Sequence, residues 1–215
     1  MTAVPLAFDG GAIDGGLYST VTGWAHAAPP WLDELVRIWS EFGLALFALL
    51  MLGAWWHARG RSPAVMARVL AAPLVVVAAY LVNLVLKGLV EEVRPCRQLP
   101  GPPTLEACPP PGDWSFPSSH AVIAAASATA LWLAWRGLGR LCAVAALLMA
   151  ASRVWVGVHY PHDVLAGVAV GVLLAAPPAL LAARAAPLVA RARAGALGPV
   201  LGAGSGAHAV PSGAL

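Results

Sequence analysis

The sequence predicts an all-α protein: a polytopic membrane helix bundle with about five transmembrane helices and a short N-terminal interfacial helix. Of the 215 residues, 60% are hydrophobic and only 11% are charged, whereas an average soluble domain carries roughly 25% charged residues. The mean hydropathy is correspondingly high, at +0.76. The apolar residues form separate runs, and several of these approach the length of roughly 20 residues that a helix needs to cross a bilayer.

The apolar runs predict five membrane spans. They cover residues 36–57, 64–87, 119–136, 139–157 and 162–184. Glu41 and Arg153 lie inside the first and fourth spans. Each lies toward one end of its span, where a charge costs less than it does near the bilayer centre. The N-terminus lacks the basic start and apolar core of a signal peptide, so we expect the first span to serve as the insertion signal.

The chain divides into three parts. Residues 1–30 form an expected outer-face segment, in which Leu17, Tyr18, Val21 and Trp24 recur at helical spacing and predict a short interfacial helix. Residues 31–185 form the transmembrane domain. Residues 186–215 end in GAGSGAHAVPSGAL, a low-complexity sequence that predicts a flexible cytoplasmic tail.

The distribution of positive charge predicts the orientation in the plasma membrane. Short cytoplasmic loops are enriched in Lys and Arg. The segments after the first, third and fifth spans, together with the adjoining span ends, carry Arg59, Arg61, Arg68, Arg136, Arg140, Arg184, Arg191 and Arg193. We therefore expect these segments and the C-terminus to be cytoplasmic. The alternate segments, which together with the adjoining span ends carry all ten acidic residues, are expected to face outside. The net charge of +3 mainly reflects this topology, and we expect no nucleic-acid partner.

The longest irregular segment is the expected outer loop of residues 91–116. Seven prolines lie between Pro95 and Pro111, which predicts a stiff but non-helical loop. Cys96 and Cys108 both fall in this loop, where an oxidising compartment would permit a disulfide. This pairing is a hypothesis, because sequence does not show the geometry that a disulfide requires. Cys142 lies in the fourth span and is expected to stay reduced.

Polar residues cluster at three places along the expected outer face. The first is KGLVEEVRP, with Lys87, the only lysine of the chain, followed by Arg94 and Pro95. Taken alone, Lys87 is typical of a lysine that ends a transmembrane helix and extends its amine to the membrane interface.

The second cluster is FPSSH, Phe116 to His120, at the start of the third span. Ser118 or Ser119 suits the N-cap position of a helix. The same geometry also permits phosphate binding, because a helix N-terminus presents unpaired amide donors and partial positive charge. His120, in the first turn, would then reach a phosphoester oxygen.

The third cluster is SRVWVGVHYPHD, Ser152 to Asp163. Pro161 and Asp163 suit the start of a helix, but two histidines, an arginine and an aspartate at a membrane boundary are costly unless they are used. A metal site formed by His159, His162 and Asp163 is the competing interpretation. Cationic residues on the same side would repel a divalent ion, so we expect no metal.

Together, the three clusters resemble the signature motifs of the type 2 phosphatidic acid phosphatase superfamily, which also includes vanadium haloperoxidases. Its pattern is Lys, six residues and Arg-Pro; then Pro-Ser-Gly-His; then Ser-Arg, five residues, His, three residues and Asp. Residues 87–95 and 152–163 match the first and third motifs fully. Ser119 replaces the usual glycine of the second, which matters if that position needs a positive φ. Residues 31–50 also resemble bacterial undecaprenyl-diphosphatase members.

The resemblance implies a mechanism with a covalent intermediate. His159 would attack phosphorus to form a phosphohistidine, and Asp163 would hold the proton on its other ring nitrogen. His120 would be the general acid for the leaving oxygen and later the base for water. Binding of the phosphate oxygens is implied for Lys87, Arg94, Ser118, Ser119 and Arg153. No cofactor is expected.

The resemblance predicts an integral-membrane lipid phosphatase that acts at the outer face on a lipid phosphate or diphosphate. Undecaprenyl diphosphate is the first choice of substrate. Phosphatidate, phosphatidylglycerol phosphate and diacylglycerol diphosphate stay open, because the motifs recognise phosphate and not the lipid tail. A non-enzymatic transporter or scaffold that binds lipid headgroups is the alternative class, whereas haloperoxidase relatives are soluble. Glu41 either pairs with Arg37 or contacts the substrate.

Overall fold

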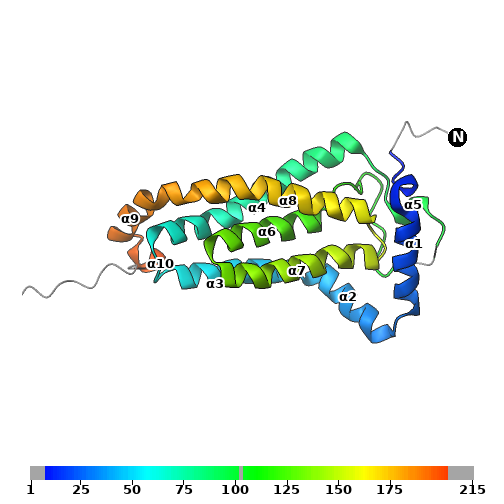
Figure 1. Cartoon of the computed structure of the whole chain (residues 1–215), viewed down its shortest axis with the longest axis horizontal. Coiled ribbons are helices and arrows are strands. Elements are labelled where there is room, and N and C mark those ends of the chain that lie inside the picture. Colours follow the sequence, from blue (N-terminus) through cyan, green and yellow to red (C-terminus); the bar gives the residue numbers. More distant parts are fainter. Residues whose placement is uncertain (1–7, 102–103, 203–215) are drawn as a thin grey trace, which may run out of the picture.

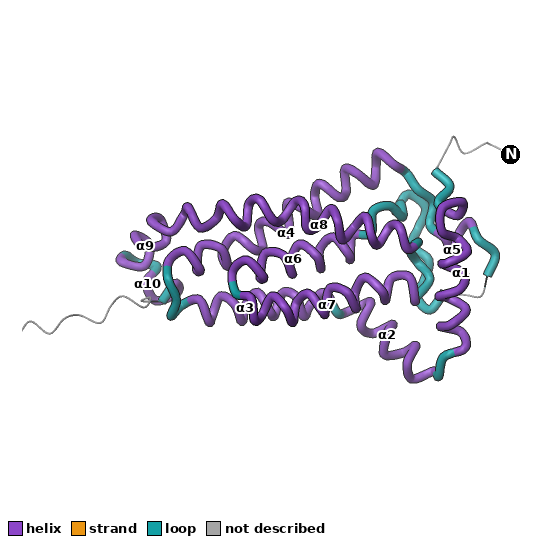
Figure 2. The backbone as a smooth tube through the Cα atoms, in the orientation of Figure 1, coloured by secondary structure: helices purple, strands orange, loops and turns teal. Residues whose placement is uncertain are grey.

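The computed structural model describes residues 8–101 and 104–202 as a bundle of helices, and these residues contain no strand (Figures 1 and 2). The helices are α1 (Gly11–Ala27), α2 (Pro30–Phe42), α3 (Leu44–Ala58), α4 (Pro63–Val90), α5 (Pro95–Gln98), α6 (Ser119–Ala134), α7 (Arg136–Trp155), α8 (Pro161–Leu181), the 3₁₀ helix η1 (Ala182–Ala185), α9 (Ala186–Ala194) and α10 (Gly198–Leu201). The predicted all-α class is confirmed.

Three described helices, those that begin at Pro63, Arg136 and Pro161, are long and apolar enough to cross a membrane. The predicted first span is not one straight helix, because α2 and α3 meet at Gly43 with a bend of 56° and form a fourth span only if they are counted together. A Cβ at Gly43 would lie 2.7 Å from Cε of Met149 in α7, so the bend contacts α7 closely. The predicted third span corresponds to α6, which has only 16 residues.

The helix α6 lies at the centre of the bundle and packs against α3, α4, α7 and α8. Its sequence is rich in alanine, and small side chains let helix backbones approach closely. The approach is closest at α8, where a Cβ at Gly171 would lie 2.6 Å from the carbonyl oxygen of Val122, and one at Gly167 would lie 2.7 Å from that of Ser118. Tight packing between α6 and α8 therefore brings the starts of these two helices together.

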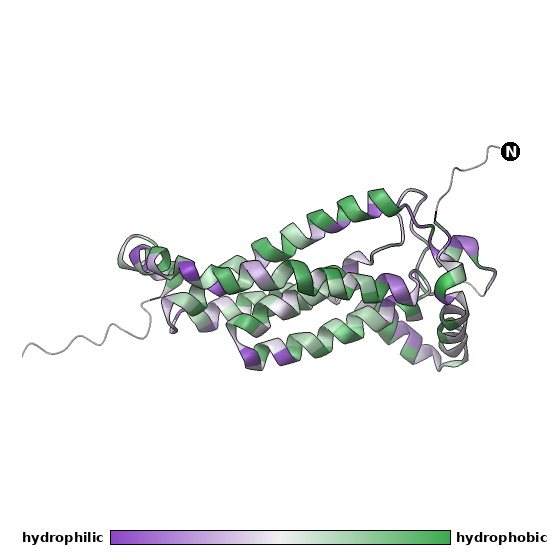
Figure 3. Cartoon of the chain, turned by 45° about the horizontal axis from the view of Figure 1, so that its top comes forward, coloured by the Kyte–Doolittle hydropathy of each residue, from purple (hydrophilic) through white to green (hydrophobic). Residues whose placement is uncertain are grey.

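Hydrophobic residues run along the length of the bundle helices (Figure 3), and many of their large side chains are exposed. Leu74, Leu89 and Leu173, for example, expose more than 70% of their surface. Large contiguous apolar surface is rare on monomeric soluble proteins. The exposed apolar surface suits contact with lipid tails.

The two ends of the bundle differ. Most loops gather at one end, where α1 lies across the bundle next to α5, while α9 and α10 lie at the other end (Figures 1 and 2). The predicted N-terminal helix is thus present as α1, and the hydroxyl of Tyr18 attaches it to the bundle by donating to the carbonyl of Gly157 at 2.9 Å. Residues 1–7 of the predicted outer segment are outside the described residues.

The start of the predicted flexible tail is instead helical. Residues 186–202 form α9 and α10, which pack at the turn between α3 and α4. Arg193 donates to the carbonyls of Ala58 at 2.9 Å and Arg61 at 2.7 Å, and Arg59 donates to that of Pro199 at 2.7 Å. Arginine side chains thus bond to backbone carbonyls at and next to helix ends. The rest of the predicted tail, residues 203–215, lies outside the described part of the chain.

Two smaller questions raised by the sequence are answered by the structure. Cys96 and Cys108 form a disulfide, as hypothesised, and Cys142 is a buried free cysteine in α7. Glu41 pairs with Arg37 at 3.1 Å on an exposed face of α2, which is the first of the two alternatives considered.

The close packing of α6 and α8 predicts opposite effects for two glycine-to-alanine substitutions. Gly171→Ala should lower the free energy of unfolding by about 1–3 kcal/mol, because the new methyl group meets the backbone of α6. Gly53→Ala, in α3 with nothing within 4 Å of the added Cβ, should be neutral or slightly stabilising. Thermal unfolding in detergent measures both; equal stability of the two variants would contradict the packing.

Candidate active site

The residues singled out in the sequence come together at the end of the bundle that carries α1. Lys87 comes from the last turn of α4, Arg94 from the segment after it, Ser118, Ser119 and His120 from the start of α6, Arg153 from the end of α7, and Asp163 from the first turn of α8. His159 lies in the turn between α7 and α8. Three sequence segments that are far apart in the chain therefore form one polar cluster.

His159 and Asp163 form a buried pair at the centre of this cluster. The Nδ1 atom of His159 lies 3.2 Å from Oδ2 of Asp163, and the two side chains are 2% and 0% exposed. The same Oδ2 accepts hydrogen bonds from the hydroxyl of Ser115 at 2.5 Å and from the amide of Tyr160 at 2.8 Å. Three donors therefore hold the carboxylate in place beside the imidazole.

Arg94 determines which nitrogen of His159 carries the proton. Its Nη1 atom lies 3.1 Å from Nε2 of His159. A guanidinium donates hydrogen bonds and accepts none, so Nε2 must offer its lone pair and the ring proton must be on Nδ1, facing Asp163. Burial lowers the pKa of His159 well below its usual value, and the positive charges of Arg94 and Arg153 lower it further. The ring is therefore neutral, with an unprotonated Nε2.

Backbone carbonyls hold two of the cations of this cluster. Arg94 donates to the carbonyls of Val158 at 3.0 Å and Asp113 at 2.8 Å. Lys87 donates to the carbonyls of Trp114 and Ser115. Both side chains are less than a tenth exposed. Their charges are consequently held in position before any ligand binds.

Each of the three predicted phosphate-binding cations is paired with a carboxylate of the outer loop. The Oδ1 atom of Asp113 lies 2.9 Å from Nη2 of Arg94 and 3.6 Å from Nζ of Lys87. Burial acts to raise the pKa of Asp113, but the charges of Arg94 and Lys87 outweigh it and lower the pKa, so the group is an anion. Glu106 pairs with Arg153 at 2.9 Å. The loop thus supplies anions where a phosphate is expected to bind.

The two serines at the start of α6 have different hydrogen-bond environments. The amide of Ser118 donates to the carbonyl of Asp163 at 3.0 Å, so it is not free for a ligand, while its buried hydroxyl has no hydrogen-bond partner within the described ranges. The hydroxyl of Ser119 accepts a hydrogen bond from Asn83 of α4 at 3.0 Å. Ser119 is helical and its φ is not positive, which explains why serine can replace the glycine of the motif.

His120 lies in the first turn of α6. The positive charges of Arg153, Arg94 and Lys87 act on His120 as they do on His159, so both histidines lie at the same cationic cluster. Because the N-terminus of a helix also carries partial positive charge, this region favours an anion.

Several residues of the site were missed in the sequence. Ser115, Asn83, Asp113 and Glu106 lie outside the three motifs, and only the acidic character of the outer loop hinted at the last two. A further cluster lies next to Asp163, where atoms of Glu92, His162 and Asp163 come within 4.8 Å of one another. The metal interpretation of the sequence grouped His159 with His162, but His159 contacts Arg94 and Asp163 instead.

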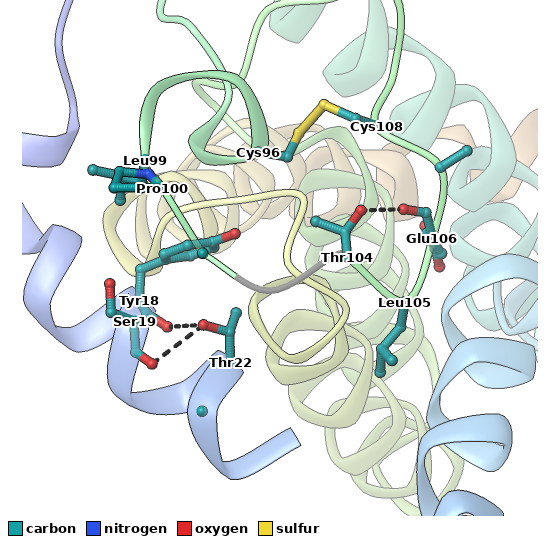
Figure 4. A pocket seen from close by; sticks show the side chains of 13 residues that line it. Tyr18, Ser19, Thr22, Cys96, Leu99, Pro100, Thr104, Leu105, Glu106 and Cys108 are labelled. Atoms are coloured by element: carbon teal, nitrogen blue, oxygen red, sulfur yellow. Dashed lines mark hydrogen bonds between the residues drawn. A yellow bond between two sulfur atoms is a disulfide. The ribbon is translucent and has the colours of Figure 1, made fainter. Parts of the chain in front are cut away.

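A pocket of about 420 Å³ opens between α1 and the loop closed by the disulfide (Figure 4). Its walls include Tyr18, Thr22, Leu99, Thr104 and Glu106. Through Glu106 it borders the ion pair with Arg153.

An apolar groove of about 400 Å³ lies between α2 and α7. Leu35 and Trp39 of α2 face Leu148 and Trp155 of α7 across it. Ser152, which precedes Arg153 in the chain, also lines the groove, so apolar surface reaches close to the cationic cluster.

Comparison with known sequences gives consistent relatives. The family model described as PAP2 superfamily matches residues 68–185. The undecaprenyl-diphosphatase BcrC of Bacillus subtilis is 29% identical over 143 residues, which cover 66% of this chain and 71% of the relative. The bacitracin transport permease protein BcrC of Bacillus licheniformis is 31% identical over 67% of this chain and 68% of its own. An undecaprenyl-diphosphatase of Sulfolobus acidocaldarius is 44% identical, over 30% of this chain and 32% of its own.

Two solved structures share the fold. Aquifex aeolicus LpxE has a TM-score of 0.63 and 22% identity, covering 83% of this chain and 99% of its own. The first transmembrane PAP2-type phosphatidylglycerolphosphate phosphatase of Bacillus subtilis has a TM-score of 0.52 and 26% identity, covering 75% and 82%. With the family model matching more than half of the chain and the three motifs meeting in one cluster, this multi-pass membrane protein belongs to the PAP2 superfamily of membrane lipid phosphatases.

Proposed function

We propose that the protein hydrolyses undecaprenyl diphosphate at the outer face of the plasma membrane, through a phosphohistidine on His159. The observation that carries this proposal is the state of His159: its Nε2 atom is unprotonated, lies 3.1 Å from Arg94, and is part of a cluster with two more cations. A nucleophile in that state is ready to attack a phosphate group that the cations hold.

The choice of substrate draws on the relatives. Two of those described above are named undecaprenyl-diphosphatases, and the longer of these matches covers 71% of the relative. The groove between α2 and α7 offers apolar surface for a lipid tail. A phosphatidylglycerol phosphate or phosphatidate substrate is the second candidate, because a structure with the same fold is titled a phosphatidylglycerolphosphate phosphatase.

Binding begins with an exchange of anions. The terminal phosphate replaces the carboxylates of Asp113 and Glu106 on the cationic cluster, so that Lys87, Arg94 and Arg153 bind its oxygens. When Arg94 moves its Nη1 donor to the phosphate, the lone pair of His159 Nε2 becomes free to face phosphorus.

The chemistry takes two steps. Nε2 of His159 attacks phosphorus, the bond to the bridging oxygen breaks, and His120 gives its proton to the lipid monophosphate that leaves. The imidazolium that forms is stabilised by Asp163 through Nδ1. Water then attacks the phosphohistidine, His120 takes a proton from that water, and inorganic phosphate leaves with Nε2 restored. His120 has to enter this cycle as an imidazolium, a form that the negative charge of the bound phosphate favours, and it ends the cycle in the same form, so the proton transfers balance.

The orientation follows from charge. The described arginines of the basic loops lie at the end opposite the site, at the turns where α3 meets α4 and α6 meets α7. If these turns are cytoplasmic, the cationic cluster faces outside, where a diphosphate carrier would present its headgroup.

The function is tested by phosphate release from purified protein in detergent with a chelator, comparing undecaprenyl diphosphate, phosphatidate and phosphatidylglycerol phosphate. We expect the isoprenoid to be preferred and His159→Ala to lose at least about 1,000-fold in rate. His57→Ala, a histidine at the far end of α3, is the matched control and should keep full activity. Preference for a glycerolipid would favour the second candidate substrate. Equal phosphate release by the wild type and by His159→Ala would refute the proposed enzymatic activity.

The pairing of Asp113 with Arg94 and Lys87 predicts competition between the loop and the substrate. Asp113→Asn should lower the inhibition constant of vanadate or inorganic phosphate about fivefold, because it removes a competing anion worth about 1 kcal/mol at a half-exposed site. Glu91→Gln removes an exposed carboxylate from the same loop and should leave the constant unchanged. Weaker inhibition of Asp113→Asn would show that the carboxylate orders the cations for the ligand instead of competing with it.

A further inference from the structure

His162, which directly precedes Asp163, links α1 to the active site. Its Nδ1 atom lies 2.8 Å from Oδ1 of Asp14, and its Nε2 atom lies 3.0 Å from Oε1 of Glu92. Its backbone amide also donates to Oδ2 of Asp14 at 2.7 Å. Asp14 is the one residue inside α1 with a non-helical backbone, and among the described residues its side chain bonds to His162 alone.

The contacts on both sides of the ring specify its protonation. Carboxylates accept hydrogen bonds and cannot donate them when ionised, so each nitrogen of His162 must carry a proton to make these two bonds. Stacking with Tyr160, at 5.4 Å between centroids, and with Phe116, at 6.0 Å, also fixes the orientation of the ring. The geometry is that of an imidazolium between two acidic side chains.

The carboxylates around His162 carry more negative charge than the single positive charge of its ring can neutralise. Glu92 and Asp163 are both 0% exposed, and Oδ1 of Asp163 has no hydrogen-bond partner in the described part of the chain. That oxygen lies 3.6 Å from Nε2 of His162. Two buried carboxylates next to each other disfavour ionisation of either one unless a positive charge compensates them.

Few other titratable groups face the ring. They are Asp14 from α1, Glu92 from the segment after α4, Tyr160 from the turn before α8 and Asp163 from α8 itself. The N-terminal segment packs on the cluster through Gly10, where a Cβ would lie 3.0 Å from Cε1 of His162. The carboxylate of Asp9, in the same segment, accepts a hydrogen bond from the amide of Gly11.

We propose that His162 is a positioning residue for the reaction on His159, an inference that rests on the proposed function. As an imidazolium, it compensates the buried charge of Glu92, keeps Asp163 ionised and holds the Oδ1 side of that carboxylate. Asp14 stabilises the charged ring, so that docking of α1 is coupled to the state of the catalytic pair. His162 acts only through Asp163 and does not contact the phosphate.

Kinetics test this role. His162→Gln, which can keep one donor but not the charge, should lower kcat about 10- to 100-fold. The KM for the lipid and the inhibition constant of vanadate should stay unchanged, because Lys87, Arg94 and Arg153 are intact. The acidic limb of the kcat profile should move to higher pH, because Asp163 loses the neighbouring positive charge that favours its ionised form. His57→Gln is the matched control.

A double-mutant cycle separates this role from simple attachment of α1. Asp14→Asn should change kcat, and the acidic limb of its pH profile, in the same direction as His162→Gln but by less. In the His162→Gln background, Asp14→Asn should have no further effect. A role in attachment alone would lower the thermal stability of each variant and leave the acidic limb where it is. Additive losses, or an unchanged pH profile, would overturn the proposal.

A measurement independent of turnover keeps the two proposals distinguishable. In protein labelled with ¹⁵N-histidine, the ring signals lost in His162→Gln should report protons on both nitrogens at neutral pH, even if no lipid phosphate is hydrolysed. A neutral ring would overturn the inference. Signals that change when EDTA is added would also overturn it, because a metal ion and not a proton would then compensate the carboxylates.

Discussion

The structure of the site depends on the contact between Arg94 and Nε2 of His159. A guanidinium can only donate, so this contact forces the lone pair onto Nε2 and the proton onto Nδ1, where Asp163 accepts it. Burial keeps the ring neutral, and the cations that would bind a phosphate also disfavour protonation of His159, the proposed nucleophile. One electrostatic arrangement would therefore prepare both the proposed nucleophile and the proposed phosphate site.

That arrangement is possible because the bundle holds its helix ends rigidly. The glycines of α8 let it approach the backbone of α6, and the amide of Ser118 bonds to the carbonyl of Asp163 across that contact. Asn83 connects α4 to Ser119 in the same region. The outer loop completes the site by placing Asp113 and Glu106 on the cations. Without those anions, buried positive charges would face one another with no compensation.

The sequence predicted the all-α class, a helix where α1 lies and the grouping of the motif residues, because apolar runs and motif spacing are local signals. The disulfide between Cys96 and Cys108 was only a hypothesis, because its geometry is not written in the sequence. It did not predict the bend at Gly43, which depends on contact with α7, or the helices α9 and α10, which are held by arginines bonded to distant carbonyls. The contacts of Ser115 and His162 around Asp163 were not predicted either, although His162 had been considered as a metal ligand, and the reason is similar. Their partners come from other segments, Asp163 for Ser115 and Asp14 and Glu92 for His162, and no periodicity in one segment reveals such contacts. The roles of His159, His120 and Asp163 remain proposals that the geometry supports.

The most direct test of the account is to trap the covalent intermediate. Undecaprenyl diphosphate labelled with ³²P in its terminal phosphate would be mixed with the His120→Gln variant, quenched in alkali, and the labelled site identified by mass spectrometry. Lipid monophosphate is a good leaving group, so loss of His120 should slow attack by water more than formation of the intermediate. The account predicts an alkali-stable, acid-labile label on His159 that is absent in His159→Ala. Hydrolysis of the lipid without any label on His159, in a variant that turns over measurably, would contradict it.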